Sequence, residues 1–212
     1  MIAATDIFHP HDFNLTEKVS NFKNPDLGAV YLTNKKEMNE IDQQVLSEIV
    51  ESNHTEPITK YKEIHLELFP EDFFLERSFK SFSKAKKFVI SFFESFQSLD
   101  LSYCSDILEK LNLFSELIAS KKSINCRFEI ISGNSCKKFH VDTVNARLIC
   151  TYAGPGTQIK NPITDNIHTL PSCSAIIAKG SKFLNFKLAT LHRSPPIKEL
   201  NIKRFLFIAD YQ

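Results

Sequence analysis

The sequence predicts an α+β fold in which helices pack on one face of a curled antiparallel sheet. Segments in the first 122 residues repeat apolar positions with the period of a helix. From about residue 123 the pattern changes to short apolar runs separated by turn signals, and four of the five glycines lie there. We expect residues 1–122 to form a mainly helical part and residues 123–212 a β-barrel core, together in one structural domain.

Composition excludes several classes of partner. The 212 residues carry 26 Lys and Arg against 25 Asp and Glu, so the chain lacks the excess of cations that nucleic acids require. No apolar run approaches the roughly 20 residues that cross a bilayer. The N-terminus lacks the basic and apolar regions of a signal peptide, and five cysteines form no regular framework. We therefore expect a cytoplasmic protein with reduced thiols, and neither a nucleic-acid nor a membrane partner.

The elements of the first part follow from periodicity. Residues 1–33 are expected to be loop, with a short strand at Ala29–Leu32. Apolar residues at spacings of three and four predict helices over residues 35–52, 82–97 and 102–120. Alternating residues at 64–68 favour a strand. Two pairs in this part have the spacing of metal ligands, His9 with His11 and His65 with Glu67. Neither pair has a further ligand nearby, so we interpret both as solvent-facing.

The second part alternates strands with turns. Gly-Asn, Gly-Pro-Gly, Lys-Gly and Pro-Pro sequences separate the apolar runs. The segment 158–172 is expected to be a loop that contributes to a pocket wall. The predicted strands cover residues 124–131, 147–152, 174–178, 186–192 and 203–209.

One motif in this part points to a metal site. His140 and Asp142 are two residues apart, so in a strand both side chains would lie on the same face. His192 ends a later strand, and two histidines with one carboxylate are the ligand set of non-haem Fe(II) oxygenases. Arg204 begins the last strand on the same face as Leu206 and Ile208. A buried arginine needs an anion, and a carboxylate is its natural bidentate partner.

This order of residues resembles the Fe(II)/2-oxoglutarate-dependent oxygenases. The resemblance implies a double-stranded β-helix, a jelly-roll or cupin-like fold, with His140, Asp142 and His192 holding the metal. It also implies that Arg204 pairs with the far carboxylate of 2-oxoglutarate. The metal it implies is Fe(II), whereas Zn(II) is the alternative for a metal-binding protein without oxygen chemistry. The substrate is a small molecule or of unknown class.

Three motifs in order resemble a second, more closely matching family of uncharacterised bacterial proteins. They are Cys136-x-x-Phe139-His140-x-Asp142, the segment Arg147–Thr157, and His192-Arg-Ser-Pro-Pro196. Members of that family are often encoded near metal-chaperone GTPases of the zinc-responsive type. This resemblance implies a role for these residues without specifying a reaction.

Other residues near the motif have two interpretations each. Arg147 lines the pocket and binds an acidic group, or it pairs with Glu129. Tyr152 hydrogen-bonds the cosubstrate, or it is a core tyrosine. Either Cys136 or Cys150, as an additional ligand, would turn the set into a closed zinc site; a buried, inert thiol is the alternative for both. His168, in the 158–172 segment, is an additional metal ligand or a residue without a role in the site.

Three functions follow from these interpretations. The first is an Fe(II)/2-oxoglutarate-type oxygenase, which needs open coordination positions and a basic anchor. The second is a cupin-like divalent-metal protein, holding zinc in metal homeostasis without oxygen chemistry. The third is a scaffold in which the histidines and the aspartate are structural. The position of Arg204 relative to the ligands separates the first function from the second.

Overall fold

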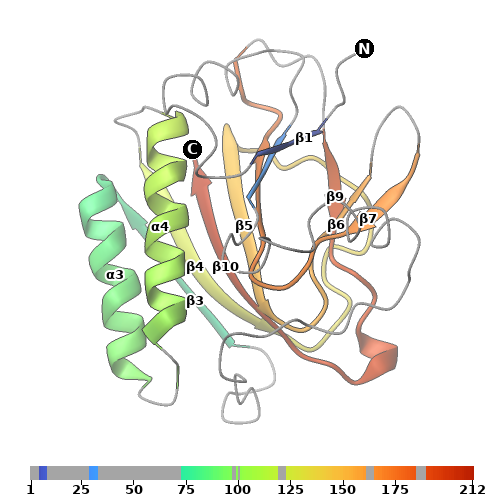
Figure 1. The fold of residues 1–212 in the computed structure, drawn as a ribbon, viewed down its shortest axis with the longest axis horizontal. Coiled ribbons are helices and arrows are strands. Elements are labelled where there is room, and N and C mark those ends of the chain that lie inside the picture. Colours follow the sequence, from blue (N-terminus) through green and yellow to red (C-terminus); the bar gives the residue numbers. More distant parts are fainter. Residues whose placement is uncertain are drawn as a thin grey trace, which may run out of the picture.

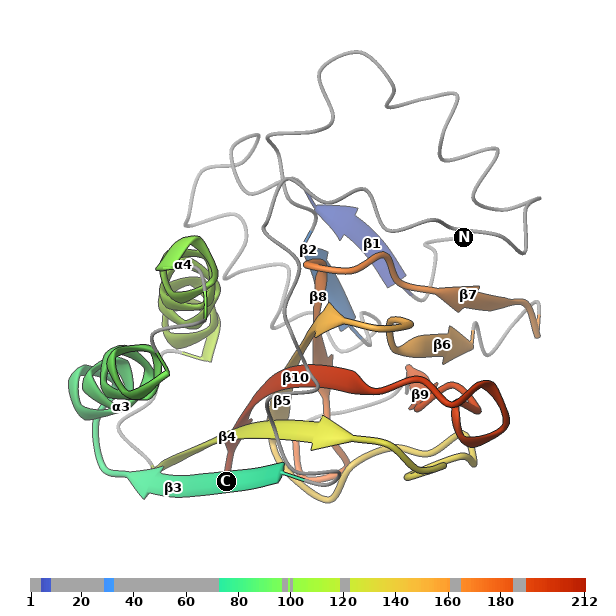
Figure 2. The same ribbon diagram turned by 90° about the horizontal axis from the view of Figure 1, so that it is seen from below.

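The computed structural model describes seven segments and one isolated residue of the chain: 5–8, 29–32, 73–96, 99, 101–118, 123–160, 165–184 and 190–212. The helix predicted over residues 35–52 and the strand predicted at 64–68 lie outside these segments, as do His9, His11 and His65. Within them, two helices cover a sheet of seven strands, and a smaller sheet of three strands completes the fold (Figures 1 and 2).

The large sheet is antiparallel except at one edge, where its first two strands pair in parallel. Its strands, in spatial order, are β1 (Thr5–Phe8), β2 (Ala29–Leu32), β8 (Ala175–Lys179), β5 (Ala146–Ala153), β10 (Arg204–Tyr211), β4 (Ile124–Ile131) and β3 (Phe73–Phe79). The small antiparallel sheet consists of β7 (Ile167–Thr169), β6 (Gln158–Lys160) and β9 (Leu191–Arg193). A short 3-10 turn, Lys198–Leu200, precedes β10.

Two helices, α3 (Phe82–Ser95) and α4 (Leu101–Ile118), confirm the predicted helices within two residues at each end. Ser81 caps α3, and its hydroxyl accepts a hydrogen bond from the backbone amide of Lys84 at 3.4 Å. Each helix buries one apolar stripe, because residues three and four apart fall on the same side.

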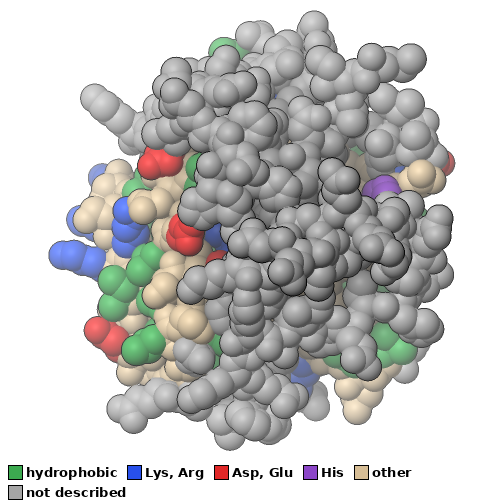
Figure 3. Space-filling model, in the orientation of Figure 1, with side chains coloured by type: hydrophobic (Ala, Val, Ile, Leu, Met, Phe, Trp, Pro, Cys, Tyr) green, Lys and Arg blue, Asp and Glu red, His purple; other side chains and the backbone are tan. Residues whose placement is uncertain are grey.

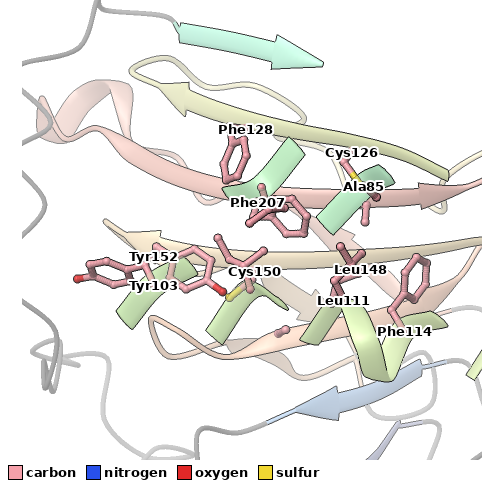
Figure 4. Packing of buried hydrophobic residues seen from close by; sticks show 14 of the residues in the cluster. Ala85, Tyr103, Leu111, Phe114, Cys126, Phe128, Leu148, Cys150, Tyr152 and Phe207 are labelled. Atoms are coloured by element: carbon pink, nitrogen blue, oxygen red, sulfur yellow. The ribbon is translucent and has the colours of Figure 1, made fainter. Parts of the chain in front are cut away.

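These stripes pack on one face of the large sheet and form the main core. Phe92 of α3 stacks on Phe128 of β4 with ring centroids 3.7 Å apart. Figure 4 shows side chains of both helices, among them Ala85 and Leu111, beside Phe128, Leu148 and other residues of the sheet. A buried aromatic face of this kind anchors the sheet against the helices and leaves its other face for the small sheet.

A second apolar cluster lies on that other face. It joins Leu206 and Ile208 of β10 to Ile149 of β5 and Ile159 of β6, so it packs the two sheets together. Neighbouring residues of β10 alternate between the two clusters, and Phe205 and Phe207 belong to the helix-facing one. The predicted alternation along the last strand is therefore confirmed.

The structure confirms the α+β class and most of the strands. The runs at 124–131 and 29–32 match β4 and β2, and three other strands, β5, β8 and β10, match within two residues. Of the run predicted at 186–192, residues 186–189 lie outside the described segments, and β9 begins at Leu191. Short strands β6 and β7 occupy part of the segment 158–172, which we predicted as a loop, because both pair within the small sheet. Strand β3 was not predicted, since none of its seven residues is buried and four are exposed at the edge of the sheet.

On the face seen in Figure 3, acidic and basic side chains are mixed with hydrophobic ones over the described residues. No helix in the described segments has the length and apolar character to cross a membrane.

Candidate metal centre

Three side chains that the sequence singled out come together between the two sheets. His140, Asp142 and His192 each offer a ligand atom, and these atoms all lie within 4.8 Å of one another. His140 and His192 also form an isolated antiparallel bridge, in which each backbone amide donates to the other carbonyl at 3.1 Å. His192 belongs to β9, and His140 lies in the connection between β4 and β5. The bridge therefore brings the two histidines together although they lie far apart in sequence.

Polar atoms in this cluster lie close together, but not all of them have a hydrogen-bond partner. Asp142 Oδ2 lies 2.9 Å from His192 Nε2, and Asp142 Oδ1 lies 3.4 Å from His140 Nε2. The first pair is at ion-pair distance, and Asp142 Oδ2 and His192 Nδ1 are both buried without a hydrogen-bond partner. A buried carboxylate oxygen in this state is costly unless a cation binds it. Two imidazoles and one carboxylate with such an oxygen fit a divalent transition-metal ion.

Backbone contacts fix the orientation of His140. Its Nδ1 lies 2.9 Å from the carbonyl oxygen of Lys138, which can only accept, so Nδ1 carries the proton in this contact. The lone pair of Nε2 is then free on the side facing Asp142. A metal-binding histidine commonly has this arrangement, with the distal nitrogen held by a carbonyl group.

The connection that carries Asp142 is held by the turn after β8. The backbone amide of Ser181 donates to the Asp142 carbonyl at 2.8 Å, and the amide of Gly180 donates to the Asn145 carbonyl at 2.9 Å. A Cβ atom at Gly180 would lie 2.8 Å from the Asp142 carbonyl oxygen and 2.1 Å from that of Val144. The close approach therefore requires glycine at this position.

Electrostatics favour a charged carboxylate at Asp142. Burial raises the pKa of Asp142, but His192, Arg147 and His140 together lower it by more, so the pKa lies below its usual value. The group is thus prepared to act as an anionic ligand.

Arg204 is fully buried at the start of β10. Its Nε donates to the carbonyl of Pro155 at 2.7 Å, and Nη1 donates to the Ser194 hydroxyl at 2.7 Å. Nη2 donates to Thr151 and Thr157 at 3.1 and 3.3 Å. These partners are all neutral, and burial lowers the pKa of Arg204 to about 10. The guanidinium therefore retains its charge at neutral pH.

The pocket next to these groups has a volume of about 340 Å³ and extends between the two sheets. The histidines line it together with Thr157 and Ser194, two of the hydroxyl partners of Arg204. Its remaining wall combines apolar side chains with a few charged ones, including Phe73, Phe74, Arg127, Glu129, Ile131, Arg147, Ile149, Leu206 and Ile208. The metal cluster and the shell of Arg204 thus share one cavity.

The other residues predicted for the site are not part of the three-ligand cluster. Arg147 binds Asp142 and Asp210 rather than Glu129, which instead pairs with Arg127. Cys136 is exposed and lines the cavity but does not belong to the ligand cluster.

Tyr152 does not join the site, because it faces the helices. Its hydroxyl donates to Asp106 Oδ2 of α4 at 2.6 Å, and that oxygen also pairs with Lys110. Thr151, its neighbour in β5, faces Arg204 instead. His168 lies in β7, and it is not part of the ligand cluster found among the described residues.

Sequence reasoning did not single out the hydroxyls around Arg204 or the carboxylate that binds Arg147. Thr157 follows the Gly-Pro-Gly turn and Ser194 follows His192 by two residues, so both lay inside motifs already noted. Asp210 lies on the same face of β10 as Arg204, and this alternation was the available signal.

Comparisons with known proteins show a family and a shared fold. A family model described as "Protein of unknown function (DUF1826)" matches residues 99–210, and no curated protein matches the sequence. The fold is similar to the dioxygenase for auxin oxidation 1 from Arabidopsis thaliana, solved as a binary complex with 2-oxoglutarate. That match has a TM-score of 0.52 and 10% identity, and it covers 99% of this chain and 92% of the other.

A second similar structure is that of a protein from Caulobacter crescentus described as a "putative 2OG-Fe(II) oxygenase family protein". It matches with a TM-score of 0.51 and 12% identity over 100% of this chain and 87% of the other. At these identities the likeness shows a shared fold.

Proposed function

The chain belongs to the DUF1826 family, and we propose that it is a non-haem Fe(II)/2-oxoglutarate-type oxygenase acting on a small molecule. We infer further that the two packed sheets form a double-stranded β-helix, the jelly-roll arrangement of cupin-like proteins. We also infer that residues 1–122 and 123–212 form one domain, because β1, β2 and β3 of the first part pair within the large sheet.

The observation that carries the proposal is the cluster of His140, Asp142 and His192. The buried Asp142 Oδ2 lacks a hydrogen-bond partner and faces His192 at 2.9 Å. These three residues would hold the metal. A bound Fe(II) ion would supply the activation of dioxygen, which amino-acid side chains do not provide.

Arg204 would bind the distal carboxylate of 2-oxoglutarate. The guanidinium is buried and has only neutral partners at hydrogen-bond distance. Thr157 and Ser194 form part of the cavity wall and also contact the guanidinium, so a carboxylate at this wall would meet both a cation and two hydroxyls. Charge-assisted hydrogen bonds of this kind are roughly twice as strong as neutral ones.

The remaining wall would orient the substrate and exclude water. Ile149, Leu206 and Ile208 give the part of the cavity on the large sheet an apolar surface. Apolar walls around a metal site lower the local dielectric and restrict side reactions.

A closed zinc site without oxygen chemistry is the alternative, and it requires a fourth protein ligand. Cys136 is the candidate because it lines the same cavity. Among the residues that the structure describes, the close ligand cluster contains three side chains and does not include Cys136. The three-ligand set favours an open site.

Binding measurements test the proposal. The purified apo protein would be equilibrated anaerobically with Fe(II), and the bound metal would be measured with and without 2-oxoglutarate. We expect one ion per chain in the wild type and loss of the ion in Asp142→Ala. Metal binding that survives in Asp142→Ala, or no binding by the wild type, would contradict the proposed site.

A further inference from the structure

A row of charged side chains crosses three neighbouring strands beside the metal cluster. Asp210 of β10 lies opposite Arg147 of β5 in the ladder, and Arg127 comes from β4 on the other side. Arg147 binds both Asp210 oxygens, through Nε to Oδ1 and through Nη2 to Oδ2 at 2.7 Å. Arg127 Nη1 donates to the same Oδ2 at 2.9 Å. Asp210 is therefore held between two arginines.

The row ends at the metal cluster on the Arg147 side. Arg147 Nη1 donates to Asp142 Oδ1, while Asp142 Oδ2 faces His192. One guanidinium thus binds two carboxylates, using one edge for Asp210 and the remaining nitrogen for Asp142. Oδ2 of Asp142 is left buried without a hydrogen-bond partner, as is Nδ1 of His192.

The two arginines differ in the carboxylates that they bind. Arg127 is neutralised by Asp210 and by Glu129, and it makes no contact with the cluster. Arg147 has Asp142 as its second anion. Asp142 lies outside the strands, so the sheet ladder does not hold its side chain in place.

We propose that Arg147 is a positioning residue: anchored by Asp210, it holds Oδ1 of Asp142 and presents Oδ2 to the ion. This inference rests on the proposed function, because it assumes that Asp142 is a ligand. It assigns Arg147 to the support of the metal centre and not to the binding of 2-oxoglutarate.

Cobalt binding tests the inference without using catalysis. Apo protein would be titrated with Co(II), and both the affinity and the visible absorption spectrum would be recorded. Arg147→Met should weaken binding by roughly 10–100-fold, the usual effect of losing an outer partner of a metal ligand. The Co(II) spectrum should also change, because the freed Oδ1 becomes available to the ion. Arg147→Lys keeps the charge but lacks the planar guanidinium that donates to both Asp210 and Asp142. Its affinity for Co(II) should therefore lie between those of Arg147→Met and the wild type.

Arg127→Met is the matched control. It removes an arginine from the same Asp210 carboxylate, on the side away from Asp142. Its affinity for Co(II) should stay within about threefold of the wild type, because Arg127 lines the cavity but pairs with Asp210 and Glu129 and with none of the three ligands. If Arg147→Met does not fold by circular dichroism, Arg147→Lys decides the question by the same two readouts.

The outcomes separate this inference from the proposed function. Wild-type affinity together with a wild-type spectrum in the Arg147 variants would overturn the positioning role alone. Equal weakening in the Arg127 and Arg147 variants would also overturn it, because the effect would then come from the row as a whole. A wild-type chain that binds no metal would overturn the proposed function and this inference with it.

Discussion

Thr151 and Tyr152 are consecutive in β5, and their side chains lie on opposite faces of the large sheet. Thr151 accepts a hydrogen bond from Arg204 at 3.1 Å, whereas Tyr152 donates to Asp106 of α4 at 2.6 Å. The sheet therefore separates the cavity on one side from a helix-covered core on the other.

The position of Tyr152 predicts an effect on stability and none on cosubstrate binding. Removing its hydroxyl takes one hydrogen bond from the buried Asp106–Lys110 pair, and a bond to a charged group contributes about 1.5–3 kcal/mol. Tyr152→Phe should lower the free energy of unfolding by roughly that amount in urea titrations. The KM for 2-oxoglutarate should be unchanged, and a large rise in KM would show that Tyr152 reaches the site.

Arg204 predicts a pH-dependent stabilisation by 2-oxoglutarate. The cosubstrate should raise the melting temperature of the wild type, because a ligand at about 100 times its Kd adds about 2.7 kcal/mol. Arg204→Met should lose this shift. Burial lowers the pKa of Arg204 to about 10, so the cation is present below that pH and is lost above it. The stabilisation should therefore persist at neutral pH and fall as the pH rises through about 10.

Two glycines allow a matched test of the connection that holds Asp142. A Cβ at Gly180 would lie 2.1 Å from the Val144 carbonyl oxygen and 2.8 Å from that of Asp142, so Gly180→Ala must displace this connection. We expect metal affinity to fall by roughly 10–100-fold, the size of effect seen when ligand support is lost. A Cβ at Gly133 would meet no atom within 4 Å, so Gly133→Ala should bind metal as the wild type does. Equal affinity in both variants would contradict the account of Gly180.

Cysteine labelling separates the open site from the closed one. All five cysteines are free, four are buried, and burial raises the pKa of Cys126 and Cys150 to about 12. At about pH 8.5, near the ordinary pKa of a thiol, iodoacetamide should label only Cys136 in the native protein. Denaturation should expose the other four.

The same labelling with metal bound tests whether Cys136 is a ligand. An open site predicts that Cys136 reacts at the same rate with and without Fe(II) or Zn(II). Protection by either metal would favour the closed site, and Cys136→Ser should then weaken binding of that metal.

Periodicity and residue spacing predicted more of the fold than of the site. The apolar stripes of α3 and α4 and the alternation in β4 and β10 depend on burial that is set locally, so their boundaries were accurate. The short strands β6 and β7 form through pairing between distant segments, which no local pattern reveals. His140 and His192 were predicted as partners, but the backbone bridge that joins them depends on the tertiary fold.

The supporting contacts were the least predictable part of the site. Arg147 had two plausible partners in the sequence, Glu129 and an acidic ligand, and it binds Asp142 and Asp210. The choice follows from strand order, because β10 lies between β4 and β5 and places Asp210 next to Arg147. Strand order is a property of the whole chain and not of the residues around Arg147.

The central claim is that His140, Asp142 and His192 form a metal site coupled to 2-oxoglutarate. Its most direct test is the conversion of 2-oxoglutarate to succinate and carbon dioxide by wild-type protein loaded with Fe(II) in air, with His192→Ala and Arg204→Met measured in parallel. We expect slow turnover even without an added substrate, none above background in His192→Ala, and a raised KM in Arg204→Met. Iron-loaded wild type that leaves 2-oxoglutarate unconsumed, with or without a panel of small-molecule substrates, would contradict it.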